Sequence, residues 1–230
     1  MEHDTLSAFK KVAKQQWGAS ACPEIMDRRC EDKSVGVITR KNCKYVFRAQ
    51  TEFKYESIAK HGKTRRLVLV LESPHVDEFV GNKAQFAPAR GATGRNIRTH
   101  ISEVLSNRPD LVEVELILMN AVQYQCSQGK PLTGKDKSLS RSNGLKRDEV
   151  FRQTFHNGEE FSARLREIVT GTNDIVINCC SKGSRSPYLR KLVGKSIDAV
   201  GEDGAWFESL ATCHPSVWFN EKLRKLREKR

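Results

Sequence analysis

The sequence lacks any long apolar run. No stretch approaches the ~20 apolar residues that a membrane-spanning helix needs. The opening Met-Glu-His-Asp does not resemble a signal peptide. The seven cysteines are an odd number without the spacing of a disulfide framework, which favours a reducing compartment. We therefore expect a cytoplasmic protein that is not embedded in a membrane.

Acidic residues are also comparatively few. Aspartate and glutamate total 28 against 40 lysines and arginines, which gives a net charge of +12. Such a charge favours a polyanionic partner, because each basic side chain that docks on a phosphate releases counterions. The sequence contains no internal repeat and no sign of a second domain, and its 230 residues suit one domain with a sizeable core. We expect a monomer with a polyanionic partner.

Strand-like and helix-like apolar patterns alternate through the central part of the chain. Strands are predicted at 66–71, 116–119, 174–179 and 208–213. Helical spacing recurs from Ile97 to Leu105 and at 148–156, 159–169 and 186–194. This alternation predicts an α/β protein of three layers, α/β/α, around a central and mostly parallel sheet.

The two ends of the chain read as additions to a core at residues 66–219. Residues 1–65 are predicted to form a helix at 5–17 and a hairpin at 34–50, and residues 220–230 to form a basic helix. Residues 127–147 hold three glycines, six basic residues and no aromatic, which predicts a flexible basic loop.

Polar side chains follow the predicted strands directly. Glu72 ends the first strand in Glu-Ser-Pro-His75, and His214 ends the last in His-Pro-Ser216. Asn120 and Asn178 end the two strands between them. The carboxyl ends of parallel strands meet at one edge of a sheet, where open α/β sheets bind ligands. A carboxylate and an imidazole are therefore predicted to face one substrate.

The order and surroundings of these strand ends resemble the uracil-DNA glycosylase superfamily. Leu71-Glu-Ser-Pro-His75 stands where that family has the turn with its water-positioning residue, and His214-Pro-Ser216 matches its later His-Pro-Ser turn. Met119-Asn-Ala-Val122 resembles the family's strand-end asparagine segment, and Gln85-Phe86 the segment with the base-stacking phenylalanine. The resemblance covers about residues 66–219.

The resemblance implies the family's fold and a hydrolase that cleaves N-glycosidic bonds in DNA. The enzyme would flip out an aberrant or modified pyrimidine, either uracil or a modified cytosine such as one in phage DNA, and leave an abasic site. His214 would donate a hydrogen bond to the departing base, and Glu72 would offset the charge of the sugar and orient water. Asn120 would read the base edge, Phe86 would stack on it, and Asn178 is a further base-contacting candidate.

Other residues are candidates for contact with the DNA backbone and duplex. Trp218 or Phe219, just after Ser216, would wedge into the gap that the flipped base leaves. The glycine-bearing segment 91–94 precedes a predicted helix and would let backbone amides approach a phosphate. The basic residues near this segment are Arg90, Arg95 and Arg98.

The chain also departs from the family pattern. Leu71 replaces the usual glycine, and Ser73 stands where the common branch has its catalytic aspartate. Glu72 instead matches a branch whose members usually hold an iron–sulfur cluster, but the cysteine spacing for a cluster is missing, so we expect no cofactor. His75 replaces the tyrosine or glycine that helps uracil-specific members exclude larger bases. It is predicted to shift substrate choice, either as a second acid–base group or by packing beside the turn.

Other interpretations remain open at this stage. Glu72 and His214 also fit structural roles, Asn120 fits a turn-former and Phe86 a core residue. A DNA-binding module of this fold without catalysis is one alternative, favoured by Ser73. A metal-dependent defence nuclease is another. His75, Asp77 and Glu78 only superficially suggest a metal site, because such a site needs more ligands in defined geometry.

Overall fold

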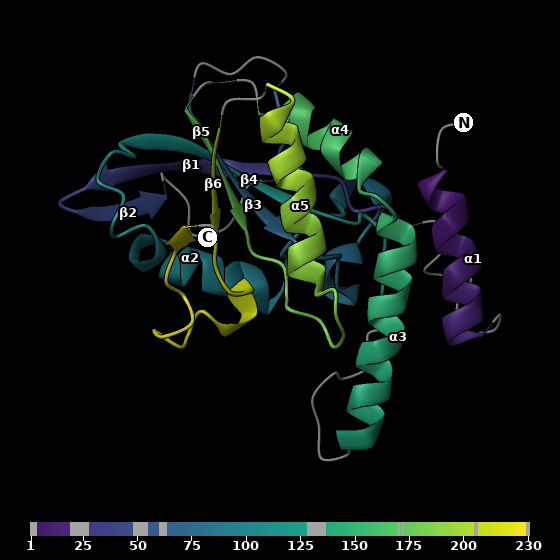
Figure 1. Ribbon diagram of the computed structural model, residues 1–230. Coiled ribbons are helices and arrows are strands. Elements are labelled where there is room, and N and C mark those ends of the chain that lie inside the picture. The colour runs from purple at the N-terminus through teal and green to yellow at the C-terminus, as the bar shows by residue number, and fades with distance from the viewer. Residues whose placement is uncertain are drawn as a thin grey trace.

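The computed structural model is built around one mixed β-sheet. It describes residues 4–18, 28–47, 55–59, 64–127, 137–169, 171, 173–204 and 207–228. The sheet has seven strands in the order β2-β1-β4-β3-β5-β6-β7 (Figure 1). The protein is therefore of the α/β class, as the alternating sequence pattern predicts.

Four neighbouring strands in the middle of the sheet are parallel. They are β4 (Glu113–Asn120), β3 (Arg66–Leu71), β5 (Asp174–Asn178) and β6 (Phe207–Ala211). Every residue of β3 is buried, as expected for a strand covered on both faces. Since β4 and β5 lie on opposite sides of β3, the strand order reverses there, and the carboxyl ends of β3 and β5 flank the reversal point.

Antiparallel strands complete both edges of the sheet. The hairpin of β1 (Lys33–Lys41) and β2 (Lys44–Phe47) joins the sheet through β4. At the other edge, β7 (Arg227–Glu228) pairs with β6. The predicted hairpin at 34–50 is confirmed over the residues that the structure describes, and it belongs to the central sheet.

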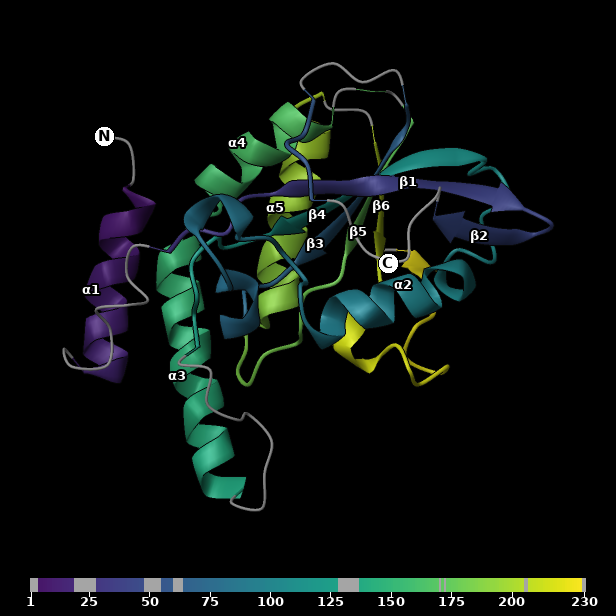
Figure 2. The ribbon, with the colours of Figure 1, turned by 180° about the vertical axis from the view of Figure 1, so that it is seen from behind.

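Helices cover both faces of the sheet, unevenly (Figures 1 and 2). One face is covered by α3 (Lys137–Phe155), α4 (Glu159–Ile168) and α5 (Leu189–Glu202), with α1 (Thr5–Trp17) packed against α3 at the side. The other packs against α2 (Ala92–Val104) and the C-terminal segment. Alternation along β3 explains the two cores, because Val68 and Val70 enter the first and Leu67 and Leu69 the second.

The prediction of a flexible loop at 127–147 is wrong over much of its length. α3 begins at Lys137, while 128–136 lie outside the described residues. Asn143, Arg147, Val150 and Thr154 share one buried or half-buried helical face. The face turns polar toward its N-terminal end, so apolar spacing alone does not detect it.

The prediction of a basic helix at 220–230 is also wrong. After turns, the described residues form β7, which covers part of the otherwise open edge of β6. Leu226 packs on the core beside α2, and Arg224 donates to the Trp218 carbonyl at 3.1 Å and pairs with Glu103 of α2. These tertiary contacts override the helical pattern.

The N-terminal helix lies beside the central sheet. α1 packs on α3, and Phe9 stacks on Tyr124 with 5.0 Å between ring centroids.

In the part of the chain that the structure describes, no helix has the length and apolar character needed to cross a membrane.

Candidate active site

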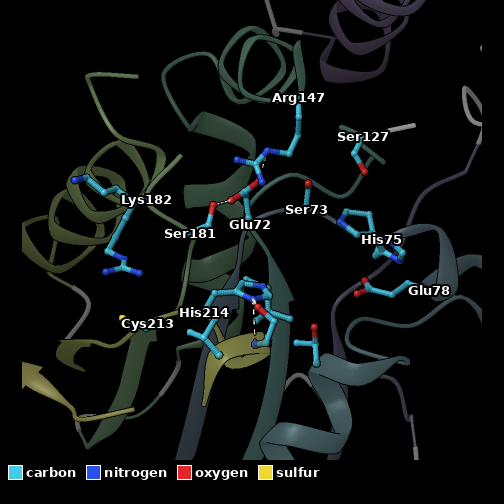
Figure 3. A pocket seen from close by; sticks show the side chains of 16 residues that line it. Glu72, Ser73, His75, Glu78, Ser127, Arg147, Ser181, Lys182, Cys213 and His214 are labelled. Atoms are coloured by element: carbon cyan, nitrogen blue, oxygen red, sulfur yellow. Dashed lines mark hydrogen bonds and ion pairs between the residues drawn. The ribbon is translucent and has the colours of Figure 1, made fainter. Parts of the chain in front are cut away.

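A cavity of about 460 Å³ lies at the carboxyl ends of the parallel strands (Figure 3). Cavities of this size suit a small-molecule ligand. Its walls come from the turns after β3, β5 and β6 and from the helices α2, α3 and α5. The lining residues are Leu71, Glu72, Ser73, Pro74, His75, Glu78, Thr93, Ser127, Arg147, Ser181, Lys182, Arg190, Cys213, His214, Ser216 and Val217.

Glu72 is the first residue after β3 and is 5% exposed. Its Oε2 accepts a hydrogen bond from the Ser181 hydroxyl, and its Oε1 lies 3.4 Å from Nε of Arg147. The Val122 N–H donates to the Glu72 carbonyl at 3.0 Å, which fixes the turn. The carboxyl group is thus held in one orientation at the cavity wall.

Arg147 of α3 supports Glu72 through a buried ionic network. Its Nε and Nη2 donate to Oδ1 of Asp148 at 3.0 and 2.6 Å. Oδ2 of Asp148 accepts from the backbone N–H of Ser184, which follows β5. The network therefore ties α3 to the turn after β5. Sequence reasoning missed Arg147 and Ser181, since one lies in the segment predicted as a loop and the other has no motif.

His214 follows β6 and begins the short 3-10 helix η4 (Pro215–Val217). Its Nδ1 accepts the Ser216 backbone N–H at 3.2 Å and lies 2.9 Å from the Ser216 hydroxyl. An Nδ1 that accepts a backbone hydrogen bond leaves the proton of the neutral ring on Nε2. Asn96 of α2 holds the same turn by donating to the carbonyls of Pro215 and Ser216 at 3.0 and 3.2 Å.

His214 is uncharged at neutral pH. Burial lowers its pKa to about 4, and the nearby positive charges of Arg147 and Arg190 act in the same direction. A neutral imidazole with its proton on Nε2 is a hydrogen-bond donor suited to an oxygen that gains negative charge. Glu72 and His214 project toward the same space (Figure 3), as the sequence predicts.

Ser73 and His75 also line the cavity. The Ser73 side chain hydrogen bonds with the buried thiol of Cys126. It is therefore not free to take the role of the catalytic aspartate that the common branch has at this position. His75 is exposed, and its Nδ1 accepts the Asp77 N–H at 3.4 Å and lies 3.3 Å from Oδ2 of Asp77. His75 therefore stands at the mouth of the cavity beside the 3-10 helix η2 (Val76–Phe79).

Asn120 and Phe86, predicted to hold the base, do not line the cavity. Asn120 is fully buried, with Nδ2 at 3.5 Å from Oε2 of Glu78 and 3.7 Å from Sγ of Cys30. Phe86 is 6% exposed and packs edge-on against Phe79, with 5.2 Å between ring centroids. Glu78, which contacts Asn120, is the residue that faces the cavity in its place.

Asn178 supports the site from behind. Its Nδ2 donates to the Arg190 carbonyl at 3.0 Å, and its Oδ1 accepts the Cys180 N–H at 3.1 Å. These bonds shape the turn that carries Ser181 and the base of α5. Asn178 is therefore a positioning residue in this structure, where the sequence predicted base contact.

The predicted DNA-contacting residues divide into exposed and buried ones. Arg95 and Phe219 are exposed, Arg98 is half-buried and Ser216 lines the cavity. Arg90 braces the loop after η2 by donating to the carbonyls of Val80 and Gln85 at 2.7 and 3.0 Å.

Trp218 is the exception, because the structure contradicts its predicted role as a wedge. The side chain is fully buried in the core beside α2, and its Nε1 donates to the Cys213 carbonyl at 2.8 Å. The indole is large and apolar, so burying it is favourable once its N–H has a partner. Phe219, which is 68% exposed, is the wedge candidate that remains.

Comparisons with known proteins add no assignment to this site. No protein-family model matches the sequence, and no curated protein is significantly similar to it. Over the described residues, no group of three or more histidine, cysteine, aspartate or glutamate side chains is arranged to hold a metal ion. Functional inference therefore starts from the side chains that face the cavity.

Proposed function

We propose that this protein is a DNA N-glycosylase that flips out an aberrant or modified pyrimidine and hydrolyses its bond to the sugar. The observation that carries the proposal is the pairing of Glu72 and a neutral His214 across one cavity at the carboxyl edge of the sheet. The net charge of +12 supports a nucleic-acid substrate. The resemblance of the strand-end turns to the uracil-DNA glycosylase superfamily supports the same reaction.

The two side chains match the two charges that the reaction creates. When the bond from C1′ to the base nitrogen breaks, the sugar becomes cationic and the base gains negative charge. Nε2–H of His214 donates to the base oxygen where this charge develops. Glu72 offsets the sugar cation and takes the proton of the water that attacks C1′, while Ser181 and Arg147 hold its carboxyl group in place.

Basic side chains on one wall fit the backbone of the flipped nucleotide. Lys182 and Arg190 line the cavity on the side of the turn after β5 and of α5. The exposed ring of Phe219 follows the His214 turn and would occupy the space left in the duplex. A flipped nucleotide would thus enter the cavity with its phosphates toward these basic side chains.

Base release under single-turnover conditions tests the proposal. Duplexes that each carry one uracil, 5-methylcytosine or 5-hydroxymethylcytosine are incubated with the protein in EDTA, and abasic sites are cleaved with alkali. We expect strand cleavage only after alkali. His214→Asn should slow base release by on the order of 10²–10³, the effect of removing one oxyanion donor.

Matched substitutions separate catalysis from general damage. Glu72→Gln should abolish most activity and keep DNA affinity, whereas Glu167→Gln on the exposed face of α4 should leave both unchanged. His156→Asn, at an exposed position outside the cavity, is the control for His214→Asn. If the wild-type protein in excess releases no base from any of the duplexes, the proposal is refuted.

The same assay distinguishes the two alternatives. A DNA-binding module without catalysis would bind the duplexes, release no base and keep its affinity in both Glu72→Gln and His214→Asn. A metal-dependent nuclease would break strands without alkali, and chelation by EDTA would stop it. Abasic sites formed in EDTA favour the glycosylase over both.

A further inference from the structure

Glu78 is a carboxyl group of the cavity that the proposed reaction does not yet use. It lies in η2, is 6% exposed and lines the cavity. Figure 3 shows its carboxyl group pointing into the cavity below His75, apart from the wall that carries Lys182. A buried ionisable group that faces a ligand cavity is a candidate for a role in the chemistry.

The carboxyl group of Glu78 is held by hydrogen-bond donors. Asn120 offers its Nδ2 at 3.5 Å, Cys30 lies 3.9 Å from Oε2, and the backbone N–H groups of Ala89 and His75 donate to the carboxyl. A carboxylate has about four acceptor sites, so these four donors fix the orientation of the group at the cavity wall. The same donors would stabilise a negative charge formed during a reaction.

The surroundings also favour a proton on Glu78 at neutral pH. Burial raises its pKa to about 8, although the hydrogen bonds from Ala89 and Asn120 act in the opposite direction. The titratable groups that face it are Asp77 of the same helix, Cys30 before β1, and Tyr55. Burial raises the pKa of the Cys30 thiol as well, and that of Tyr55 to about 12, so both are neutral.

We propose that Glu78 is a general acid that protonates ring nitrogen N3 of a cytosine-class pyrimidine as its glycosidic bond breaks. This assignment rests on the proposed glycosylase function and names its substrate class. The electron pair of the bond from C1′ to N1 moves onto the base, and the proton of Glu78 moves to N3. Water adds to C1′ and gives its proton to Glu72, after which Glu72 releases that proton to solvent and Glu78 regains one.

The chemistry of the base edge explains the choice of cytosine over uracil. N3 of cytosine carries a lone pair and accepts a proton, whereas N3 of uracil already bears hydrogen. The amino group of cytosine at C4 would donate to the second oxygen of Glu78. A protonated cytosine leaves as a neutral base, so Glu78 removes the charge that makes cytosine a poor leaving group. Uracil gains no such help.

Single-turnover release of 5-hydroxymethylcytosine and of uracil tests this assignment. Glutamine at position 78 keeps the shape and one acceptor oxygen but has no acidic proton to give. We expect Glu78→Gln to slow release of the cytosine-class base by on the order of 100-fold, the scale of general acid catalysis. The rate of any uracil release should change by less than about threefold, which is clearly distinct from the effect on the cytosine-class base.

The pH profile supplies a second readout that a structural role would not move. In the wild type the rate for the cytosine-class base should fall as pH rises through about 8, where Glu78 loses its proton. Glu78→Gln should lack this fall. Glu78→Asp keeps an acid and should recover part of the rate, which guards against a variant that fails to fold, and Glu167→Gln is the control.

Each contrary outcome has a distinct meaning. Equal slowing of both bases by Glu78→Gln, or an unchanged fall in rate above pH 8, overturns the general-acid role. Release of uracil alone by the wild type overturns the cytosine assignment while the glycosylase proposal stands. Absence of base release from every duplex overturns the glycosylase proposal itself.

Discussion

Replacing Glu78 with glutamine removes a buried ionisable group and keeps its size, so the change isolates the free energy of burying a carboxylate. The surroundings raise the carboxyl pKa from the ordinary 4.5 to about 8. Each pKa unit corresponds to about 1.4 kcal/mol, so ionisation destabilises the folded state by at most roughly 5 kcal/mol. A measured effect of a few kcal/mol is expected, because local rearrangement and water reduce the penalty.

The sign of the effect follows from proton binding. Between about pH 4.5 and 8 the folded protein holds the Glu78 proton and the unfolded chain does not. The stability that this group contributes is full below about 4.5 and is lost as pH rises through about 8. The wild type should therefore lose stability relative to Glu78→Gln across this window.

Urea unfolding at pH 5, 7 and 9 measures the difference between the two proteins. Other titrating groups are common to both and cancel in the comparison. Glu167→Gln, an exposed carboxyl on α4, should show no comparable pH-dependent difference. A difference between wild type and Glu78→Gln that stays constant from pH 5 to 9 would refute the reasoning, because it would mean that the Glu78 carboxyl is not desolvated by folding.

Three further predictions follow from contacts of the site. Arg147→Met should destabilise the fold by about 3–5 kcal/mol in urea unfolding, since Asp148 would be left buried without its ionic partner. Ser181→Ala should slow base release about tenfold and lower the melting temperature by only a few degrees, because Glu72 loses one hydrogen bond of about 1.4 kcal/mol. Phe219→Ala should weaken DNA binding in a fluorescence titration without lowering the melting temperature, whereas Trp218→Ala should lower the melting temperature.

Sequence patterns predict most of the central sheet. Short buried strands such as β3 and β5 appear as apolar runs bounded by polar residues, and the polar residue that follows each run is visible directly. Glu72 and His214 were found in this way, because parallel strands bring their carboxyl ends together. Because the alternating pattern predicts parallel strands, it also predicts that Glu72 and His214 share one cavity.

Side chains whose roles depend on tertiary contacts could not be predicted. Arg147 reaches the site only because α3 extends toward the N-terminus through a polar stretch, and Glu78 replaces Asn120 at the cavity because η2 lies over the end of β4. Trp218 or Phe219 was predicted as the wedge, and nothing in the sequence shows that the Trp218 indole is the buried one of the two. Nor does composition show that the C-terminal segment pairs with β6.

The hydrogen bonds by which His214 caps η4 also stabilise one orientation of its imidazole ring over the flipped one. A half-turn of the imidazole about its bond to Cβ would remove Nδ1 from the Ser216 N–H and hydroxyl. Losing these contacts costs about 2 kcal/mol, which corresponds to roughly a thirtyfold preference for the observed rotamer. Most molecules thus hold the Nε2 proton in place before any ligand enters, and encounters with an inverted ring are rare.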